Sequence, residues 1–502
     1  MKKLLALLLC LCFALGGCAQ NDVTQHDEEG GGVMPVSDQT QREALSIEKL
    51  ALATAELPEL PEEPDEAAFY EELDALDYDK LGAEAYSKAY DELWGAYSTR
   101  QDAYYAAMEA LRGEGVSPTL KGALTSYTLR TAERLTAEET EKNVVYSPAN
   151  LYLALSMLAE TTDGDSRAQI LSLLGLDSVE QARTAANAIW RNLYRDGAQD
   201  KVLLANAVWL NDNLEIKQDT VDTLAKDYYA SAFRAPMGDA ATDDAIHQWV
   251  NDNTNHLLEE AANGLKTDDD TLMMLLSTLY FKGTWADQFA AFETREDTFT
   301  AADGTAQTID FMHSVKNGTY YRIGNYTAAA LPFRDGMSMW FLLPDEGTRL
   351  NDVWTLTWNL PMVATTTTEG CYEMPDIASL AQEGTGEIHW SVPKFDVRSD
   401  LDLIPALKAL GVENVFDDRA DFTPLTDTPA EVSAVEHAAR VKVDEEGCEA
   451  AAFTAITAEA TSALVEPLPV VEMNLNRPFG FLITGVTGLP LFLGAVNTTA
   501  AS

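Results

Sequence analysis

The sequence is poor in the side chains that most often carry catalysis or bind metals. Its 502 residues include only six histidines, and none falls in an HExxH pattern. The chain also lacks a G-x-S-x-G nucleophile elbow and a glycine-rich phosphate loop. With 81 acidic residues, neighbouring carboxylates carry no information about a site. We therefore expect no enzyme, no cofactor and no metal site.

Cysteine is equally scarce, with five in the chain. Cys10 and Cys12 belong to a hydrophobic run at the N-terminus, and Cys18 closes it. That leaves Cys371 and Cys448 in the part expected to fold. Two cysteines do not indicate a disulfide framework, and no Cys–His spacing typical of zinc occurs.

Basic residues are few: 34 Lys and Arg stand against 81 Asp and Glu, for a net charge of −47. Such a balance argues against nucleic acid as a partner and against electrostatic docking on anionic membranes. The hydrophobic content of 46% is enough for a substantial core.

The N-terminus has the features of an export signal: two lysines, an apolar run and small residues before Cys18. Leu15-Gly16-Gly17-Cys18 resembles a bacterial lipobox, whose cysteine carries the lipid of the mature protein; a plain signal peptide ending near a cysteine is the alternative. We predict a signal at residues 1–18 and a flexible tether at 19–41. The protein would then be secreted and lipid-anchored to a bacterial cell surface through Cys18.

Residues 42–116 are acidic and rich in aromatic side chains at roughly helical spacing. We interpret them as an acidic helical N-terminal extension, an amphipathic helix pair packed on a main domain at residues 117–502. A carbohydrate- or partner-binding role for the aromatics is the alternative. The spaced residues are Phe69, Tyr70, Leu73, Tyr86, Tyr90, Leu93, Trp94 and Tyr97.

The pattern over the main domain predicts a mixture of helices and strands. Ser147-Pro148 marks a helix start, because proline in the first turn costs no hydrogen bond. We expect helices over Leu120–Leu135, Leu151–Leu158 and Ile246–Asn255, and strands within Ala205–Leu210, Met337–Gly347 and Ile388–Val397.

One stretch, VDEEGCEAAAFTAITAEATS at residues 443–462, does not settle on a local structure. Alanine is a poor strand former, so the run suits a strand, a helix or an exposed loop. As a strand, one face would be small and uncharged, and the other would carry both glutamates of the run. The first face is Cys448, Ala450, Ala452, Thr454, Ile456 and Ala458; the second is Glu449, Ala451, Phe453, Ala455, Thr457 and Glu459.

EEGCEAAAFTA within this stretch resembles the hinge of the reactive-centre loop in serpins. NVVYSPANLYLALSMLAE, LLSTLYFKGTW, NRPF and PLFLG resemble other segments of that family, in the same order. The resemblance covers roughly residues 117–497. It implies an α+β serpin fold, with a large central, mostly antiparallel sheet, surrounding helices and an exposed reactive-centre loop. An ordinary exposed alanine-rich loop is the alternative for the stretch taken alone.

The resemblance implies that the protein is a suicide substrate of a serine protease and acts as a monomer. The protease cuts the loop and forms an acyl-enzyme; the freed loop then inserts into the main sheet and traps the protease covalently. A non-inhibitory serpin, a binding or structural surface protein, is the alternative, and the small uncharged face of the hinge favours inhibition. The implied hinge is Glu445, Glu446, Gly447, Cys448, Glu449, Ala450, Ala451 and Ala452. Cys448 stands where the family prefers Thr or Ser.

The family's usual spacing from Glu445 places the reactive bond at Thr461–Ser462. Because the loop continues unusually far before Pro467, Ala460–Thr461 and Leu464–Val465 stay open as alternatives. A small residue before the cut suits an elastase- or subtilisin-like pocket. No basic residue occurs between Lys442 and Arg477, which disfavours trypsin-like targets.

Five further positions match residues that gate sheet opening in the family: Ser147, Asn150, Ser277, Trp285 and His437. Two depart from the family pattern, because Asn150 replaces a Ser and Ser277 replaces an Asn. An exchange of hydrogen-bonding roles between these two is our expectation.

Overall fold

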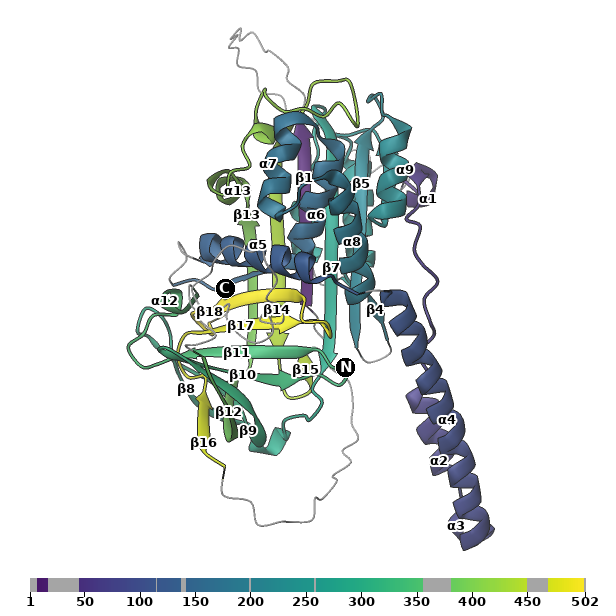
Figure 1. Ribbon diagram of the computed structural model, residues 1–502, viewed down its shortest axis with the longest axis vertical. Coiled ribbons are helices and arrows are strands. Elements are labelled where there is room, and N and C mark those ends of the chain that lie inside the picture. The colour runs from purple at the N-terminus through teal and green to yellow at the C-terminus, as the bar shows by residue number, and fades with distance from the viewer. Residues whose placement is uncertain are drawn as a thin grey trace, which may run out of the picture.

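The computed structural model describes residues 7–16, 45–113, 115–136, 141–197, 200–256, 259–354, 381–448 and 468–500. Two large sheets and a set of helices make an α+β fold (Figure 1). Helices α5 to α8 lie over one face of the main sheet, and α2 to α4 extend away from the body.

The main sheet is antiparallel at every neighbouring pair along its described path except β5–β6. Its order is β13 (Phe395–Asp402), β14 (Glu431–Val443), β1 (Leu7–Gly16), β7 (Thr271–Thr284), β5 (Lys201–Asn211), β6 (Ala230–Ala235) and β2 (Ala51–Ala53). Off this path, β4 (Arg195–Asp196) pairs with β5, and β15 (Gly447–Cys448) pairs with β7.

The second sheet packs against the end of the first. Its order is β16 (Val470–Asn474), β12 (Ala381–Pro393), β9 (Ala306–Ile323), β10 (Tyr326–Pro332), β11 (Ser338–Pro344), β17 (Phe479–Thr484), β18 (Pro490–Val496) and β3 (Val144–Tyr146), with β8 (Arg295–Thr300) beside β9. The single strand expected over Ile388–Val397 is wrong. It is two strands in different sheets, separated at Lys394, whose N–H donates to the Asp310 carbonyl 2.8 Å away.

A helix lies at each of the three places where the sequence predicts one in the main domain, as α5, α6 and α10. The helices are α1 (Ile47–Leu50), α2 (Glu66–Asp74), α3 (Tyr78–Leu81), α4 (Ala83–Arg112), α5 (Pro118–Thr136), α6 (Pro148–Thr161), α7 (Gly164–Leu174), α8 (Val179–Leu193), α9 (Gln218–Asp227), α10 (Ala240–Asp252), α11 (Glu259–Gly264), α12 (Leu350–Trp354) and α13 (Ile404–Ala409), with 3-10 turns at Ala291–Glu293 and Asn414–Phe416. Helix α10 begins six residues earlier than expected, because its polar first turn carries no hydrophobic spacing. Among the described residues, none of these helices has the length and apolar character needed to cross a membrane.

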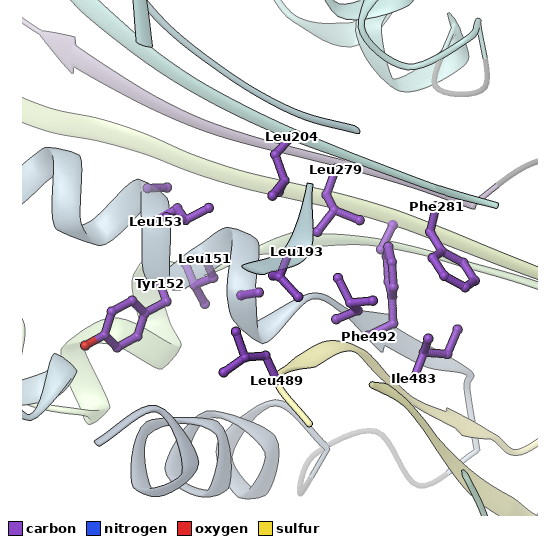
Figure 2. Close-up of a cluster of buried hydrophobic side chains, with 14 of the residues drawn as sticks. Leu151, Tyr152, Leu153, Leu193, Leu204, Leu279, Phe281, Ile483, Leu489 and Phe492 are labelled. Atoms are coloured by element: carbon purple, nitrogen blue, oxygen red, sulfur yellow. The ribbon is translucent and has the colours of Figure 1, made fainter. Parts of the chain in front are cut away.

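Helix α6 forms the floor beneath the main sheet. Its N-terminus is capped by Ser147, whose hydroxyl accepts the Asn150 N–H at 3.1 Å, and Pro148 occupies the first turn. Every residue of α6 is buried. Figure 2 shows Leu151 and Leu153 of α6 in one apolar cluster with Leu279 and Phe281 of β7 and Phe492 of β18. Each such side chain contributes about 1.5–3 kcal/mol when it leaves water.

Side chains of β7 alternate between two separate cores, as the pleat of a strand requires. Met273, Leu275, Leu279 and Phe281 face the main core with α6, while Met274, Leu276 and Tyr280 pack with Trp249 of α10 on the other face. This alternation fixes which face any strand beside β7 would turn toward the main core.

The N-terminal extension contacts the body near its start. Residues 51–53 form β2 at the edge of the main sheet, and the Glu56 N–H donates to the Ala225 carbonyl at 2.9 Å. Beyond them, α2 and α4 pack through Phe69, which stacks on Tyr97 with ring centroids 4.2 Å apart and meets Trp94 at 5.4 Å. Phe69 and Tyr97 are therefore buried between the two helices, whereas Tyr90 and Trp94 are 38% and 46% exposed.

Candidate functional site

The described part of the hinge is already attached to the end of β7. After β14, the Asp444 N–H donates to the Gly447 carbonyl at 3.0 Å and closes a turn. Gly447 and Cys448 then run antiparallel to β7, opposite Thr284 and Gly283. Trp285 reinforces the junction: its N–H donates to the Glu446 carbonyl at 3.1 Å, and its indole Nε1 donates to the Asp444 carbonyl at 3.0 Å.

Glu445 anchors the start of the hinge from three sides. Its carboxylate lies 2.9 Å from the Lys394 ammonium and accepts the Thr294 hydroxyl at 2.9 Å. Its carbonyl accepts the Phe289 N–H at 3.0 Å. These contacts fix the backbone at the start of the hinge.

Gly447 lies too close to β7 for any larger residue. A Cβ at this position would stand 2.2 Å from the Gly283 carbonyl oxygen, well inside contact distance. The next residue, Cys448, has only 1% of its surface exposed and belongs to the main core. The Cys448 side chain therefore points into the main core.

A strand site lies between β14 and β7. In this structure β1 occupies it, antiparallel to both neighbours, with Leu11 opposite His437 on one side and Ser277 on the other. The sequence assigns residues 1–18 to an export signal, and that assignment stays a prediction. The backbone pairing shows that one antiparallel strand fits between β14 and β7.

Beneath this strand site, His437 and Ser147 are bonded. The Ser147 N–H donates to His437 Nε2 at 3.2 Å. Burial lowers the pKa of His437 to about 3, so the imidazole is neutral near pH 7. Because Nε2 accepts, the proton sits on Nδ1, which is buried and has no hydrogen-bond partner among the described residues.

Asn150 and Ser277 do not share a partner. The Ser277 hydroxyl bonds Asn206 Oδ1 at 2.7 Å, and Asn206 Nδ2 donates to the Tyr228 carbonyl at 2.9 Å. Both amide atoms of the buried Asn150 side chain lack partners within the described part of the chain. Buried polar groups are rarely left unpaired, so this row holds unused hydrogen-bonding capacity.

Trp285 lies apart from the other four gate residues, at the end of β7. It has 2% of its surface exposed and stacks on Phe333 with centroids 4.6 Å apart and planes at 6°. The predicted gate residues therefore lie in two separate groups. Ser147, Asn150, Ser277 and His437 form a buried polar row under the middle of the strand site, and Trp285 stacks on Phe333 where the hinge begins.

Several predicted residues lie outside the described residues: Cys18, Glu449, Ala450, Ala451, Ala452, Ala460, Thr461, Ser462, Leu464 and Val465. The sequence reasoning missed Asn206, the partner of Ser277, and Lys394, the partner of Glu445. No local sequence pattern marks either residue, because each bonds a partner that is distant in the sequence. In the part of the chain that the structure describes, no cluster of His, Cys, Asp or Glu could hold a metal ion.

Comparison with known proteins identifies this arrangement. The family model described as "Serpin (serine protease inhibitor)" matches residues 122–499. The chain belongs to the serpin family. Serpin-ZXA of Oryza sativa subsp. japonica is 30% identical over 394 residues, spanning 74% of this chain and 95% of the rice serpin.

Solved serpin structures match as well. The Arabidopsis AtSerpin1 in its native stressed conformation is 25% identical, with a TM-score of 0.64, and the match covers 77% of this chain and all of AtSerpin1. The thermophilic serpin tengpin in its native state is 26% identical, with a TM-score of 0.63, and the match covers 75% of this chain and 94% of tengpin. The predicted serpin fold is confirmed, and serpins are inhibitors rather than enzymes.

Proposed function

We propose that this serpin is a suicide inhibitor of serine proteases whose cut loop enters the strand site between β7 and β14. The observation that carries the proposal is the pairing of Gly447 and Cys448 with Thr284 and Gly283. The first two residues of the inserting strand are in register before any cut is made, so insertion continues a strand that already exists.

The register extends without a break. Each step along the hinge moves one residue back along β7, so Ala450 would lie opposite Phe281 and Ala452 opposite Leu279. Both β7 residues face the main core. Ala450, Ala452, Thr454, Ile456 and Ala458 would follow Cys448 onto the inward face. A charge there would be buried without a partner and would cost several kcal/mol, which the sequence avoids.

Thr454, the polar residue among these five, falls on the polar row. In the same register it lies opposite Ser277, and the strand that now occupies the site places His437 on the other side of that position. Its hydroxyl would meet the unpaired His437 Nδ1 there, with the unpaired Asn150 amide on the helix beneath. Insertion would then satisfy polar groups that have no partner among the described residues of the uncut protein.

The free energy for displacing a bound protease would come mainly from the new strand itself. An inserted strand of about ten residues bonds to neighbours on both sides, and each backbone hydrogen bond contributes about 0.5–1.5 kcal/mol net. The total is on the order of 10 kcal/mol. The uncut form would persist because a kinetic barrier, rather than the lowest free energy, protects it.

We place the reactive bond at Thr461–Ser462, with Ala460–Thr461 and Leu464–Val465 as alternatives. Small residues before the cut fit elastase- or subtilisin-like pockets. The run between Lys442 and Arg477 offers no basic residue to a trypsin-like pocket.

We also propose that the protein works as a lipid-anchored monomer at a bacterial cell surface. Cys18 would carry the lipid, and residues 19–41 would hold the inhibitor away from the membrane. Removal of residues 1–18 has a second consequence in this proposal. It empties the strand site that β1 occupies and makes it available to the loop.

The test is to incubate the chain lacking residues 1–18 with elastase, subtilisin, chymotrypsin and trypsin. Complexes that survive SDS are separated on gels, and the released C-terminal fragment is sequenced. A covalent complex with a new N-terminus at Ser462 would support both the mechanism and the bond. Cleavage without a complex for every protease would contradict inhibition and support the non-inhibitory alternative.

A further inference from the structure

The N-terminal extension contacts the body close to the place where the hinge begins. Glu66, at the start of α2, holds the guanidinium of Arg334 with both carboxylate oxygens at 3.1 and 3.2 Å. Arg334 lies in the turn between β10 and β11 of the second sheet, directly after Phe333, on which Trp285 stacks. The extension is thus bonded to the second sheet next to the stacked pair of Trp285 and Phe333.

The same contact reaches Thr284, the last residue of β7. The Arg334 N–H donates to the Thr284 carbonyl at 2.9 Å, and the Thr284 N–H donates to Asp200 Oδ1 at 2.7 Å. Both backbone groups of Thr284 are therefore held from the side that faces the extension. Thr284 is also the residue opposite Gly447 of the hinge. One residue links the two regions.

A second contact places the extension against the turn after β4. The Glu63 carboxylate lies so close to Gly197 that a Cβ on that glycine would stand 2.6 Å from its oxygen. Earlier in the chain, residues 51–53 pair with β6. A segment of sixteen residues, 51–66, therefore touches the outer strand of the main sheet, the turn before β5 and the second sheet.

We propose that the N-terminal extension is a built-in brake on hinge insertion, acting through Glu66, Arg334 and Thr284. This inference rests on the proposed function. For a strand to enter between β7 and β14 at the hinge end, the end of β7 must move relative to its surroundings. The extension resists that movement, because it ties the β7 side of the main sheet to the β10–β11 turn. Residues 45–113 lie outside the segment that matches the serpin family model, so this brake is a feature of this chain.

The brake acts through its position rather than its strength. The Glu66 and Arg334 side chains are 30% and 39% exposed, and ion pairs of that exposure contribute at most about 1 kcal/mol. A change of that size alters a rate by about fivefold. Reversing one charge should exceed the loss of the pair, because it places two cations side by side.

The experiment measures amide hydrogen exchange in the full chain for peptides covering residues 283–289 and 444–448. Glu66→Arg should raise exchange there by about fivefold or more. The double variant Glu66→Arg with Arg334→Glu restores an opposite-charge pair and should return exchange to the original rate. Arg334 makes its bond to Thr284 through the backbone, so that bond survives the substitution. Glu92→Arg is the control, because it reverses one member of an exposed ion pair with Lys88 within α4.

Faster exchange in Glu66→Arg, rescue in the double variant and no change in Glu92→Arg would support the brake. Equal exchange in all four proteins would overturn it, and so would an equal rise in Glu92→Arg. Trapping of elastase or subtilisin is assayed on the same variants after removal of residues 1–18. Absence of any covalent complex with either protease would contradict the proposed function. The amide exchange rates test the brake independently of that outcome.

Discussion

Cys448 lies opposite Gly283 and turns its side chain into the core beneath the main sheet. Only 1% of its surface is exposed. Gly283 leaves room for two aromatic rings at this junction, because a Cβ there would come within 2.7 Å of the Phe281 ring and 2.8 Å of the Phe333 ring. In the proposed insertion, this pair would set which of the later hinge residues face the main core.

Neighbouring alanines of the hinge should respond oppositely to a charge. Ala450→Glu would bury an unpaired carboxylate opposite Phe281. The free-energy barrier to insertion would then rise by several kcal/mol. Ala451→Glu would point to the other face, in the row of Arg440, whose guanidinium already holds Asp396, and so would stay outside the main core. We expect Ala450→Glu to be cleaved as a substrate without trapping, and Ala451→Glu to keep trapping. The ratio of complex to cleaved inhibitor on SDS gels measures this, and equal ratios would refute the register.

The hydroxyl of Thr454 should stabilise only the cut, inserted form. Thr454→Val keeps the shape but leaves His437 Nδ1 unpaired, which costs about 1–3 kcal/mol. We expect a lower Tm for the cleaved variant by a few degrees and no change in the uncut variant. Thr457→Val is the matched control, because Thr457 would face away from the main core, opposite Met274. A loss of equal size in the control would show that Thr454 does not reach the polar row.

Stability should depend on pH through Asp200. Burial and the nearby Asp335 carboxylate raise the pKa of Asp200 from 3.8 to about 7; Glu63 adds to this, while the Thr284 N–H and Arg334 oppose it. The native state therefore holds a proton that the unfolded chain releases between pH 3.8 and 7. Stability from this group is full below pH 3.8 and is lost as the pH rises through 7.

Asp200→Asn keeps an oxygen to accept the Thr284 N–H but removes the titration. We expect acidification from pH 7.5 to 5.5 to stabilise the original protein more than the variant, by on the order of 1 kcal/mol. Urea midpoints at the two pH values check this. Comparing the two proteins cancels His437, whose lowered pKa acts in the opposite direction as pH falls below 6.5. Identical pH responses would exclude Asp200 as the source.

Residues 1–18 should block inhibition while they remain attached. The chain that keeps them has β1 in the strand site, so its cut loop would have to displace a paired strand. We expect this form to be cleaved without trapping, and the form lacking residues 1–18 to trap. The two forms are compared at equal concentration by the yield of SDS-resistant complex. Equal yields would mean that β1 does not compete with the loop.

The serpin fold was predictable from the sequence because several segments that resemble the family occur in the family's order. The alternation after Gly447 predicted an inward face beginning at Cys448, and Cys448 is buried. Ser147-Pro148 marked the start of α6 because capping and proline geometry act within one turn.

Long-range contacts had no such signal. Ser277 bonds Asn206 on a neighbouring strand, and Thr284 bonds Asp200 and Arg334 from two different loops. The break at Lys394 was missed because the hydrophobic alternation continues across it while the chain changes sheets. These features depend on which segments meet, and no pattern within a single segment records that.

Insertion of the loop is the central claim, and thermal unfolding before and after one cut tests it most directly. The chain lacking residues 1–18 is cut once within residues 449–467 by elastase or subtilisin, and the cleaved protein is purified. If the loop enters between β7 and β14, its new backbone hydrogen bonds should raise the Tm by at least about 10 °C. An unchanged or lower Tm after the cut would contradict insertion.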